Sequence, residues 1–112
     1  MSNYNLESVE EMAGGDQDFV KVVVQTFLEE IPPDLEGMNQ AILEGNSAQA
    51  YQYAHKMKPN LQMFGLELMP QIRIIEDWSK AGKNEDEVHE AGRIITAKYK
   101  KAELELKEDF DL

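Results

Sequence analysis

The spacing of apolar residues in the first half of the chain constrains the fold most strongly, because it fits one face of a long helix. Over residues 20–42 apolar side chains recur at steps of three and four, at Val20, Val24, Phe27, Ile31, Leu35, Met38 and Ile42. Pro32 and Pro33 interrupt this stripe without shifting its phase, so we expect a kink, or a break with a new helix starting at Pro33. Asp16 can cap the start of the element, and the Gly45-Asn46-Ser47 cluster ends it.

The same spacing predicts two helices after this element. The first begins at Asn46 or Ser47, where Gln49 is placed to form a capping box with Asn46. Its apolar stripe ends at Phe64. Gly65 follows as a stop signal for the helix or as a site of close approach. The second helix runs from about Glu67 to Lys80 and is followed by a turn.

Helical patterns also occupy the two ends of the chain. Asn84 and Glu87 can form a capping box for a last helix, whose apolar stripe continues to Leu106. A short opening helix is expected from about Leu6 to Ala13. The acidic residues 108–112 are expected to be a frayed tail.

Amphipathic helices with short connections predict an all-α fold. We expect an antiparallel up-and-down four-helix bundle with a short additional N-terminal helix. The length of 112 residues favours one domain over two, so residues 1–112 are assigned to a single domain. The sequence contains no cysteine, which removes disulfides, thiolate zinc sites and thiol catalysis and fits a reducing compartment.

The charge of the chain excludes several classes of partner. With 22 acidic and 11 basic residues the net charge is −11, which disfavours binding to nucleic acid and to anionic membranes. No apolar run approaches the roughly 20 residues of a membrane span, and the N-terminus lacks the features of a signal peptide. We therefore expect a cytoplasmic protein, and we expect it to be a monomer.

The charge is unevenly distributed along the sequence. Residues 1–50 hold ten acidic residues and one basic residue, a sum of −9, whereas residues 51–112 hold twelve and ten, a sum of −2. Most of these charges are accounted for by solvated helix faces. Lys56 and Lys58 differ from the other cations because they flank one of the two histidines.

Motifs for enzymatic or metal chemistry have little support. The sequence has no HExxH, no Glu-x-x-His pair, no phosphate-binding loop at Gly14-Gly15 and no nucleophile elbow. We therefore expect no metal and no cofactor, and no independent catalytic site. His89 lies among acidic residues near the start of the last helix and is interpreted as a surface histidine.

His55 is placed differently from His89. It comes directly after Ala54, which belongs to the apolar stripe of this helix, and therefore lies about 100° around the helix axis from it. Its ring should stand at the edge of the core and reach water. Tyr51, Lys58 and Gln62 lie on the same ridge, at spacings of three and four. A half-exposed imidazole with a cation one turn along is suggestive of chemistry.

The stretch from Ala54 to Leu66 resembles the signature of histidine-containing phosphotransfer domains. His55, Lys58 and Gly65 match that signature in type and spacing, and the upstream stretch Phe27–Pro32 resembles the helix that precedes it in this family. The resemblance extends from about Asp16 to the last helix. Motif, helix order and length agree with one another.

The resemblance implies a phosphorelay intermediate of two-component signalling. His55 would take a phosphoryl group from the aspartyl phosphate of one receiver domain and pass it to another, and the partners would be response-regulator receivers and a hybrid sensor kinase. Lys58 can pair with phosphoryl oxygens. The receiver would bring Mg²⁺ and most of the catalytic groups.

Other residues would support the imidazole on this interpretation. Asp77 or Glu76, on the neighbouring helix, could accept the second ring N–H and fix the tautomer, and Asp77 matches the polar position that many family members use. Gln62 could hydrogen-bond the imidazole or be solvated, and Gly65 would keep the docking face flat.

Apolar residues of the first long helix have two interpretations. The receiver would dock on exposed parts of that helix and of the His55 helix. Ile31, Leu35 and Met38 could belong to this contact or to the core, and the sequence does not separate the two.

The sequence departs from the family pattern at Pro59, where glycine is usual. Proline cannot donate to the carbonyl of His55 and should bend the helix, which could expose His55 or spoil the docking surface. The main alternative is therefore a non-catalytic helical adaptor that binds receivers without transfer. An acidic nucleic-acid mimic ranks last, because the acids alternate with apolar stripes. Met1 is consistent with a freestanding protein, although the chain could also be a domain cut from a hybrid kinase.

Overall fold

The all-α class is confirmed by a computed structural model, which describes residues 3–81 and 85–112. Within these residues it contains five helices and no strand. The helices are α1 (Glu7–Ala13), α2 (Gln17–Leu43), α3 (Ser47–Met63), α4 (Met69–Ala81) and α5 (Glu85–Asp109). None of them is long and apolar enough to cross a membrane.

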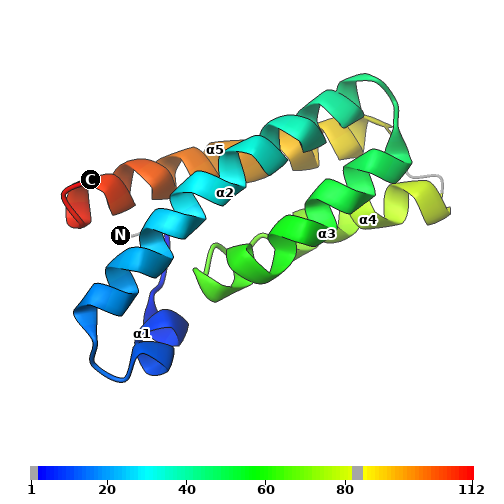
Figure 1. Ribbon diagram of the computed structural model, residues 1–112. Coiled ribbons are helices and arrows are strands. Elements are labelled where there is room, and N and C mark those ends of the chain that lie inside the picture. The colour runs from blue at the N-terminus through cyan, green and yellow to red at the C-terminus, as the bar shows by residue number, and fades with distance from the viewer. Residues whose placement is uncertain (1–2, 82–84) are drawn as a thin grey trace.

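The four longer helices pack side by side in chain order and close into a bundle. The packed pairs are α2 with α3, α3 with α4, α4 with α5, and α5 with α2, while α1 packs against α2. Figure 1 shows that successive helices of the bundle run in alternating directions, and the described N-terminal segment is bonded to the end of α5. This arrangement places α3, which carries His55, between α2 and α4.

The long helix α2 continues through its two prolines, so the predicted alternative of a break at Pro33 is wrong. Pro33 is exposed and Pro32 is half-buried, so neither proline is part of the fully buried stripe of α2. Ile31 and Leu35 are buried on either side of the prolines. Burial of one continuous stripe therefore keeps both parts of the helix on the same core.

Two of the predicted caps are confirmed. The Asp16 side chain accepts from the N–H groups of Asp18 and Phe19. The Asn46 side chain accepts from the N–H of Gln49 at 3.1 Å, whereas the N–H of Asn46 donates to the carbonyl of Ala41. The predicted box at Asn46 is therefore half formed.

The remaining predicted boundaries are met in part. The predicted box between Asn84 and Glu87 lies partly outside the described residues. α4 begins at Met69 and not at Glu67, because Glu67 has a φ of 57°, which is incompatible with a right-handed helix.

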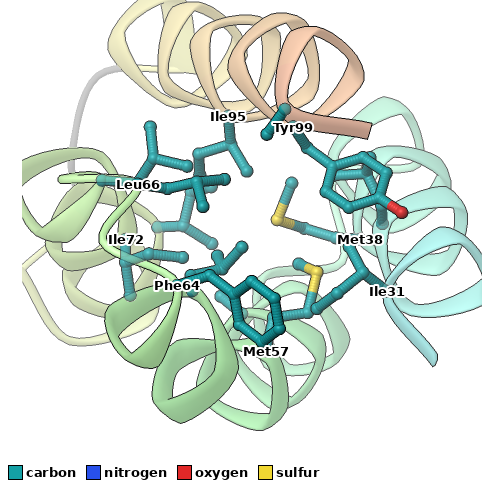
Figure 2. Packing of buried hydrophobic residues seen from close by; sticks show 14 of the residues in the cluster. Ile31, Met38, Met57, Phe64, Leu66, Ile72, Ile95 and Tyr99 are labelled. Atoms are coloured by element: carbon teal, nitrogen blue, oxygen red, sulfur yellow. The ribbon is translucent and has the colours of Figure 1, made fainter. Parts of the chain in front are cut away.

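The core is formed by side chains from all four long helices, as Figure 2 shows. Ile31, Leu35 and Met38 are all at most 5% exposed, so they belong to the core and not to a docking surface. The rings of Phe27 and Phe64 stack with their centroids 3.8 Å apart, which joins α2 to the end of α3. Tyr99 packs against Phe27, and burial raises the pKa of its hydroxyl, which donates to Glu103.

The prediction of a frayed C-terminal tail is wrong. α5 continues to Asp109, Phe110 packs against the core, and the N–H of Leu112 donates to the carbonyl of Lys107. The tail is also bonded to the other end of the chain, because the hydroxyl of Tyr4 donates to the Asp109 carboxylate. A partner 105 residues away along the chain could not be inferred from the local acidic composition.

The N-terminal segment also crosses the end of α3. The N–H of Asn5 donates to the carbonyl of Phe64 at 2.7 Å, and Gly65 lies directly beneath Asn5. A Cβ added at Gly65 would lie 2.7 Å from the Cβ of Asn5, and Gly65 has a φ of 64°. Glycine is therefore required here both by the left-handed backbone and by close approach of the N-terminal segment.

Substitution of Gly65 and of Gly45 by alanine separates these two effects. Gly45 has a φ of 70° but nothing within 4 Å of an added Cβ, so Gly45→Ala introduces backbone strain alone. We expect a loss of about 1–2 kcal/mol in the free energy of unfolding for Gly45→Ala. Gly65→Ala should lose about 1 kcal/mol more, because Asn5 must move. Urea unfolding of both variants tests this, and equal losses in the free energy of unfolding would contradict the close approach of Asn5 to Gly65.

Candidate functional site

The imidazole of His55 stands on the outer surface of α3, beside α4. Its side chain is 63% exposed, although Ala54 and Met57 on the same helix are fully buried. The ring is nevertheless fixed at one edge, because its Nδ1 lies 3.2 Å from Oε2 of Glu76 on α4. The packing of α3 against α4 thus produces an exposed histidine with one nitrogen bound.

This contact defines which nitrogen of His55 is free. A carboxylate can only accept a hydrogen bond, so Nδ1 carries the hydrogen that is donated to Glu76. In the neutral ring the lone pair is then on Nε2. Among the described residues none is hydrogen-bonded to Nε2, and the exposure of the ring leaves this nitrogen accessible.

Glu76 also binds the cation that the sequence places one turn after His55. The Nζ of Lys58 lies 3.4 Å from Oε1 of Glu76, while Oε2 of the same carboxylate binds His55. The carboxylate is largely buried, with 12% of the Glu76 side chain exposed, so each of its oxygens has a donor in place of water. One acid from α4 therefore holds both candidate site residues of α3.

An aromatic ring lies on the other side of His55 along the helix. Tyr51 is one turn before His55, and the two ring planes are 6° from parallel with their centroids 5.6 Å apart. Lys80, from the end of α4, places its Nζ 5.5 Å from the centroid of the Tyr51 ring. The sequence places Tyr51 on the same ridge as His55 but does not by itself show that the rings stack.

A second ion pair, between Lys56 and Asp34, was not predicted from the sequence. The Nζ of Lys56 lies 3.2 Å from Oδ1 of Asp34 on α2, and Asp34 is 7% exposed overall. One sequence feature indicates that Asp34 is buried: it lies three residues after Ile31, on the helix face of the apolar stripe. The pairing means that Lys56 is directed toward α2 and Lys58 toward α4.

The other residues that the sequence singled out are not bonded to the imidazole within the part of the chain that the structure describes. Asp77 is exposed and makes no hydrogen bond or ion pair within the described residues, since the adjacent Glu76 occupies the side of α4 that faces α3. Gln62 is exposed and is not bonded to His55. Lys58, Gln62 and Gly65 all line a cavity of about 270 Å³ where α3 meets α4. The N-terminal contact described above accounts for glycine at position 65, and its predicted role in a docking face stays a prediction.

The described residues add no support for a metal site. His89 is exposed on α5. In residues 3–81 and 85–112, no group of three or more His, Asp or Glu side chains is arranged to hold a metal ion. The chemistry that the described groups can perform is that of a nucleophilic imidazole with a carboxylate at one edge and an ammonium nearby.

Comparison with known proteins identifies the family. The family model described as Hpt domain matches residues 22–106, which covers α3, α4 and most of α2 and α5. Neither the curated proteins nor the solved structures gave a significant match. The resemblance inferred from the stretch around His55 is thereby confirmed. The chain belongs to the Hpt domain family, which implies a phosphotransfer role in two-component systems.

Proposed function

We propose that the chain, acting as one domain over residues 1–112, is a phosphorelay intermediate that carries the phosphoryl group on Nε2 of His55. It would accept this group from the aspartyl phosphate of one receiver domain and pass it to another. The observation that carries the proposal is an exposed imidazole whose Nδ1 is held by a largely buried carboxylate, which leaves Nε2 as the nitrogen with a free lone pair. Membership of the Hpt family supplies the class of reaction.

The transfer step requires only the aspartyl phosphate and the His55 imidazole. The Nε2 lone pair attacks the phosphorus of the aspartyl phosphate, and the bond from phosphorus to the aspartyl oxygen breaks with its electron pair. The receiver regains a carboxylate, and His55 becomes an imidazolium that bears phosphate on Nε2 and hydrogen on Nδ1. Onward transfer reverses these steps with a second receiver, and no proton need leave the ring.

Glu76 contributes to the step in which His55 accepts the phosphoryl group. Its carboxylate lies 3.2 Å from Nδ1 and accepts from it before transfer, which fixes that edge of the ring. The same contact places a negative charge beside the ring when transfer makes the ring positive. A charge-assisted hydrogen bond of this kind contributes about 1.5–3 kcal/mol. Glu76 therefore favours the charged phosphorylated ring over the neutral ring.

Lys58 supplies positive charge for the phosphoryl oxygens. Its ammonium shares the Glu76 carboxylate with His55, which keeps it beside the imidazole in the absence of phosphate. Its side chain is 30% exposed, so it remains within reach of an incoming group. Catalysis of phosphoryl transfer rests mainly on positioning and charge compensation, and the receiver would add Mg²⁺ and the remaining groups.

A receiver-binding adaptor without transfer is the second candidate, and Pro59 is the observation that favours it. Proline removes a helix donor one turn after His55 and is costly inside a helix. However, α3 continues through Pro59 to Met63, and Pro59 is exposed at the surface. The adaptor predicts receiver binding with no transfer of phosphate to the wild-type chain.

Labelling of His55 tests the two candidates. Incubation with a phosphorylated receiver should give acid-labile, alkali-stable phosphate on the wild type, whereas His55→Gln should fall to background because the nucleophile is absent. His89→Gln is the matched control and should label like the wild type, since His89 is exposed on α5. Receiver binding without label on the wild type would support the adaptor, and equal labelling of His55→Gln would rule out His55 as the acceptor.

Neutralising the acid beside the ring should slow transfer. Glu76→Gln keeps the shape of the side chain but removes the charge that stabilises the imidazolium, so we expect the single-turnover rate from a phosphorylated receiver to fall about tenfold or more. Asp77→Asn makes the same chemical change at an exposed neighbour and should stay within about twofold of the wild type. If Asp77→Asn caused the larger loss, the assignment of Glu76 would be incorrect.

The two lysines that flank His55 should differ in their effect on transfer. Lys58→Ala removes the positive charge that would pair with the phosphoryl oxygens and should lower the saturated transfer rate about tenfold. Circular dichroism should show that the fold is retained. Lys56→Ala removes the same charge but faces Asp34, so its effect on the saturated rate should be within about threefold. Equal effects of the two substitutions would indicate general positive potential and not a specific contact.

A further inference from the structure

We infer that Tyr51 is a positioning residue for phosphotransfer, which fixes the plane of the His55 ring and stabilises that ring in its phosphorylated state. The inference rests on the proposed function, in which Nε2 of His55 is the acceptor. It is based on the parallel stacking of the two rings and on the anchoring of Tyr51 by Lys80.

The hydrogen bond to Glu76 does not by itself orient the imidazole. It fixes one edge of the ring, at Nδ1, while the plane can still turn about that contact. The lone pair of Nε2 lies in the ring plane, so the tilt of the plane sets the direction from which phosphorus can be attacked. In-line phosphoryl transfer depends strongly on this direction.

Tyr51 supplies the second contact that the ring plane requires. The two planes lie within 6° of parallel, with a centroid separation of 5.6 Å, and the residues are one helical turn apart. Tyr51 is itself half-buried, whereas the His55 side chain is 63% exposed, so the less mobile ring limits the more exposed one. Edge and face of the imidazole are thus held from two different sides.

Lys80 connects this stack to α4. Its Nζ lies 5.5 Å from the centroid of Tyr51, within the range of a cation–π contact. Tyr51 therefore contacts α4 through Lys80, and His55 contacts α4 through Glu76. The imidazole itself contacts Tyr51 and Glu76, while Lys80 contacts Tyr51 and Lys58 contacts Glu76.

The same contact acts on the phosphorylated ring. Phosphorylation at Nε2 with hydrogen retained on Nδ1 places a positive charge on the imidazole. The electron-rich ring of Tyr51 attracts that charge, and an exposed cation–π contact of this kind changes an equilibrium about two- to fivefold. Tyr51 should therefore shift phosphoryl exchange from the receiver toward this protein.

Two substitutions at Tyr51 test the role of the ring. Tyr51→Leu removes the aromatic face but keeps an apolar side chain, whereas Tyr51→Phe keeps the face and removes the hydroxyl. For Tyr51→Leu we expect the phosphoryl exchange equilibrium with a phosphorylated receiver to shift about two- to fivefold toward the receiver, and the saturated transfer rate to fall about threefold or more. Tyr51→Phe should restore both quantities to within about twofold of the wild type.

A spectroscopic signature separates stacking from a merely structural role. In proton–carbon NMR spectra, the ring protons of His55 should lose their ring-current shift in Tyr51→Leu and keep it in Tyr51→Phe. Tyr53→Leu is the matched control, because Tyr53 lies on the same helix but packs against Gly37 of α2. It should lower stability without moving the exchange equilibrium or the His55 signals.

The possible outcomes distinguish this inference from the proposed function. If His55→Gln abolishes labelling but Tyr51→Leu exchanges phosphate like the wild type, the proposed function stands and the role of Tyr51 is overturned. The role is also overturned if Tyr51→Phe changes the exchange equilibrium and the transfer rate as much as Tyr51→Leu does, since the hydroxyl and not the aromatic face would then matter. We expect the phosphoryl exchange equilibrium to shift toward the receiver in Tyr51→Leu and to stay near the wild-type value in Tyr51→Phe.

Discussion

The arrangement around His55 depends on the largely buried carboxylate of Glu76. This single acid accepts from a histidine and pairs with a lysine of the neighbouring helix, so one side chain of α4 contacts both. Placing a carboxylate at the edge of a core is unfavourable unless both oxygens are bonded, and here both are. The contact at Nδ1 of His55 is therefore also a contact between α3 and α4, so the geometry of the candidate site and the helix packing cannot be changed independently at this position.

Packing on the other face of α3 sets where that carboxylate meets the histidine. The stacked rings of Phe27 and Phe64 join α2 to the end of α3, and a Cβ added at Gly37 would lie 2.5 Å from the Tyr53 ring, so α2 and α3 approach closely there. A helix held in this way has little freedom to rotate. The core thus determines which residues of α3 face α4, and His55 is exposed at a fixed angle.

Local patterns in the sequence were sufficient for the class of fold and for the position of His55. Apolar stripes at steps of three and four predicted the helices, and the residues flanking His55 resembled the signature of the family. Periodicity could not choose between Glu76 and Asp77, because that choice depends on how α4 is rotated against α3. Asp34 and the bonded C-terminal tail were missed for a related reason, since their partners lie on other helices or at the opposite end of the chain. The effect of the two prolines on the long helix was overestimated, because continuous burial of the apolar stripe outweighs the loss of helix hydrogen bonds.

The order of helix contacts has a consequence for how the chain folds. Among the described helices that pack extensively, α2 with α5 is the pair not adjacent in sequence, and the remaining pairs are consecutive. Contacts between consecutive helices close short loops and form on the microsecond to millisecond scale in small helical bundles. The bonds from Asn3 to Glu105 and from Tyr4 to Asp109 close the longest loops and carry the largest entropic cost. We therefore expect the layer of α2, α3 and α4, which contains the His55 site, to form early, and the junction of the two chain ends to form last.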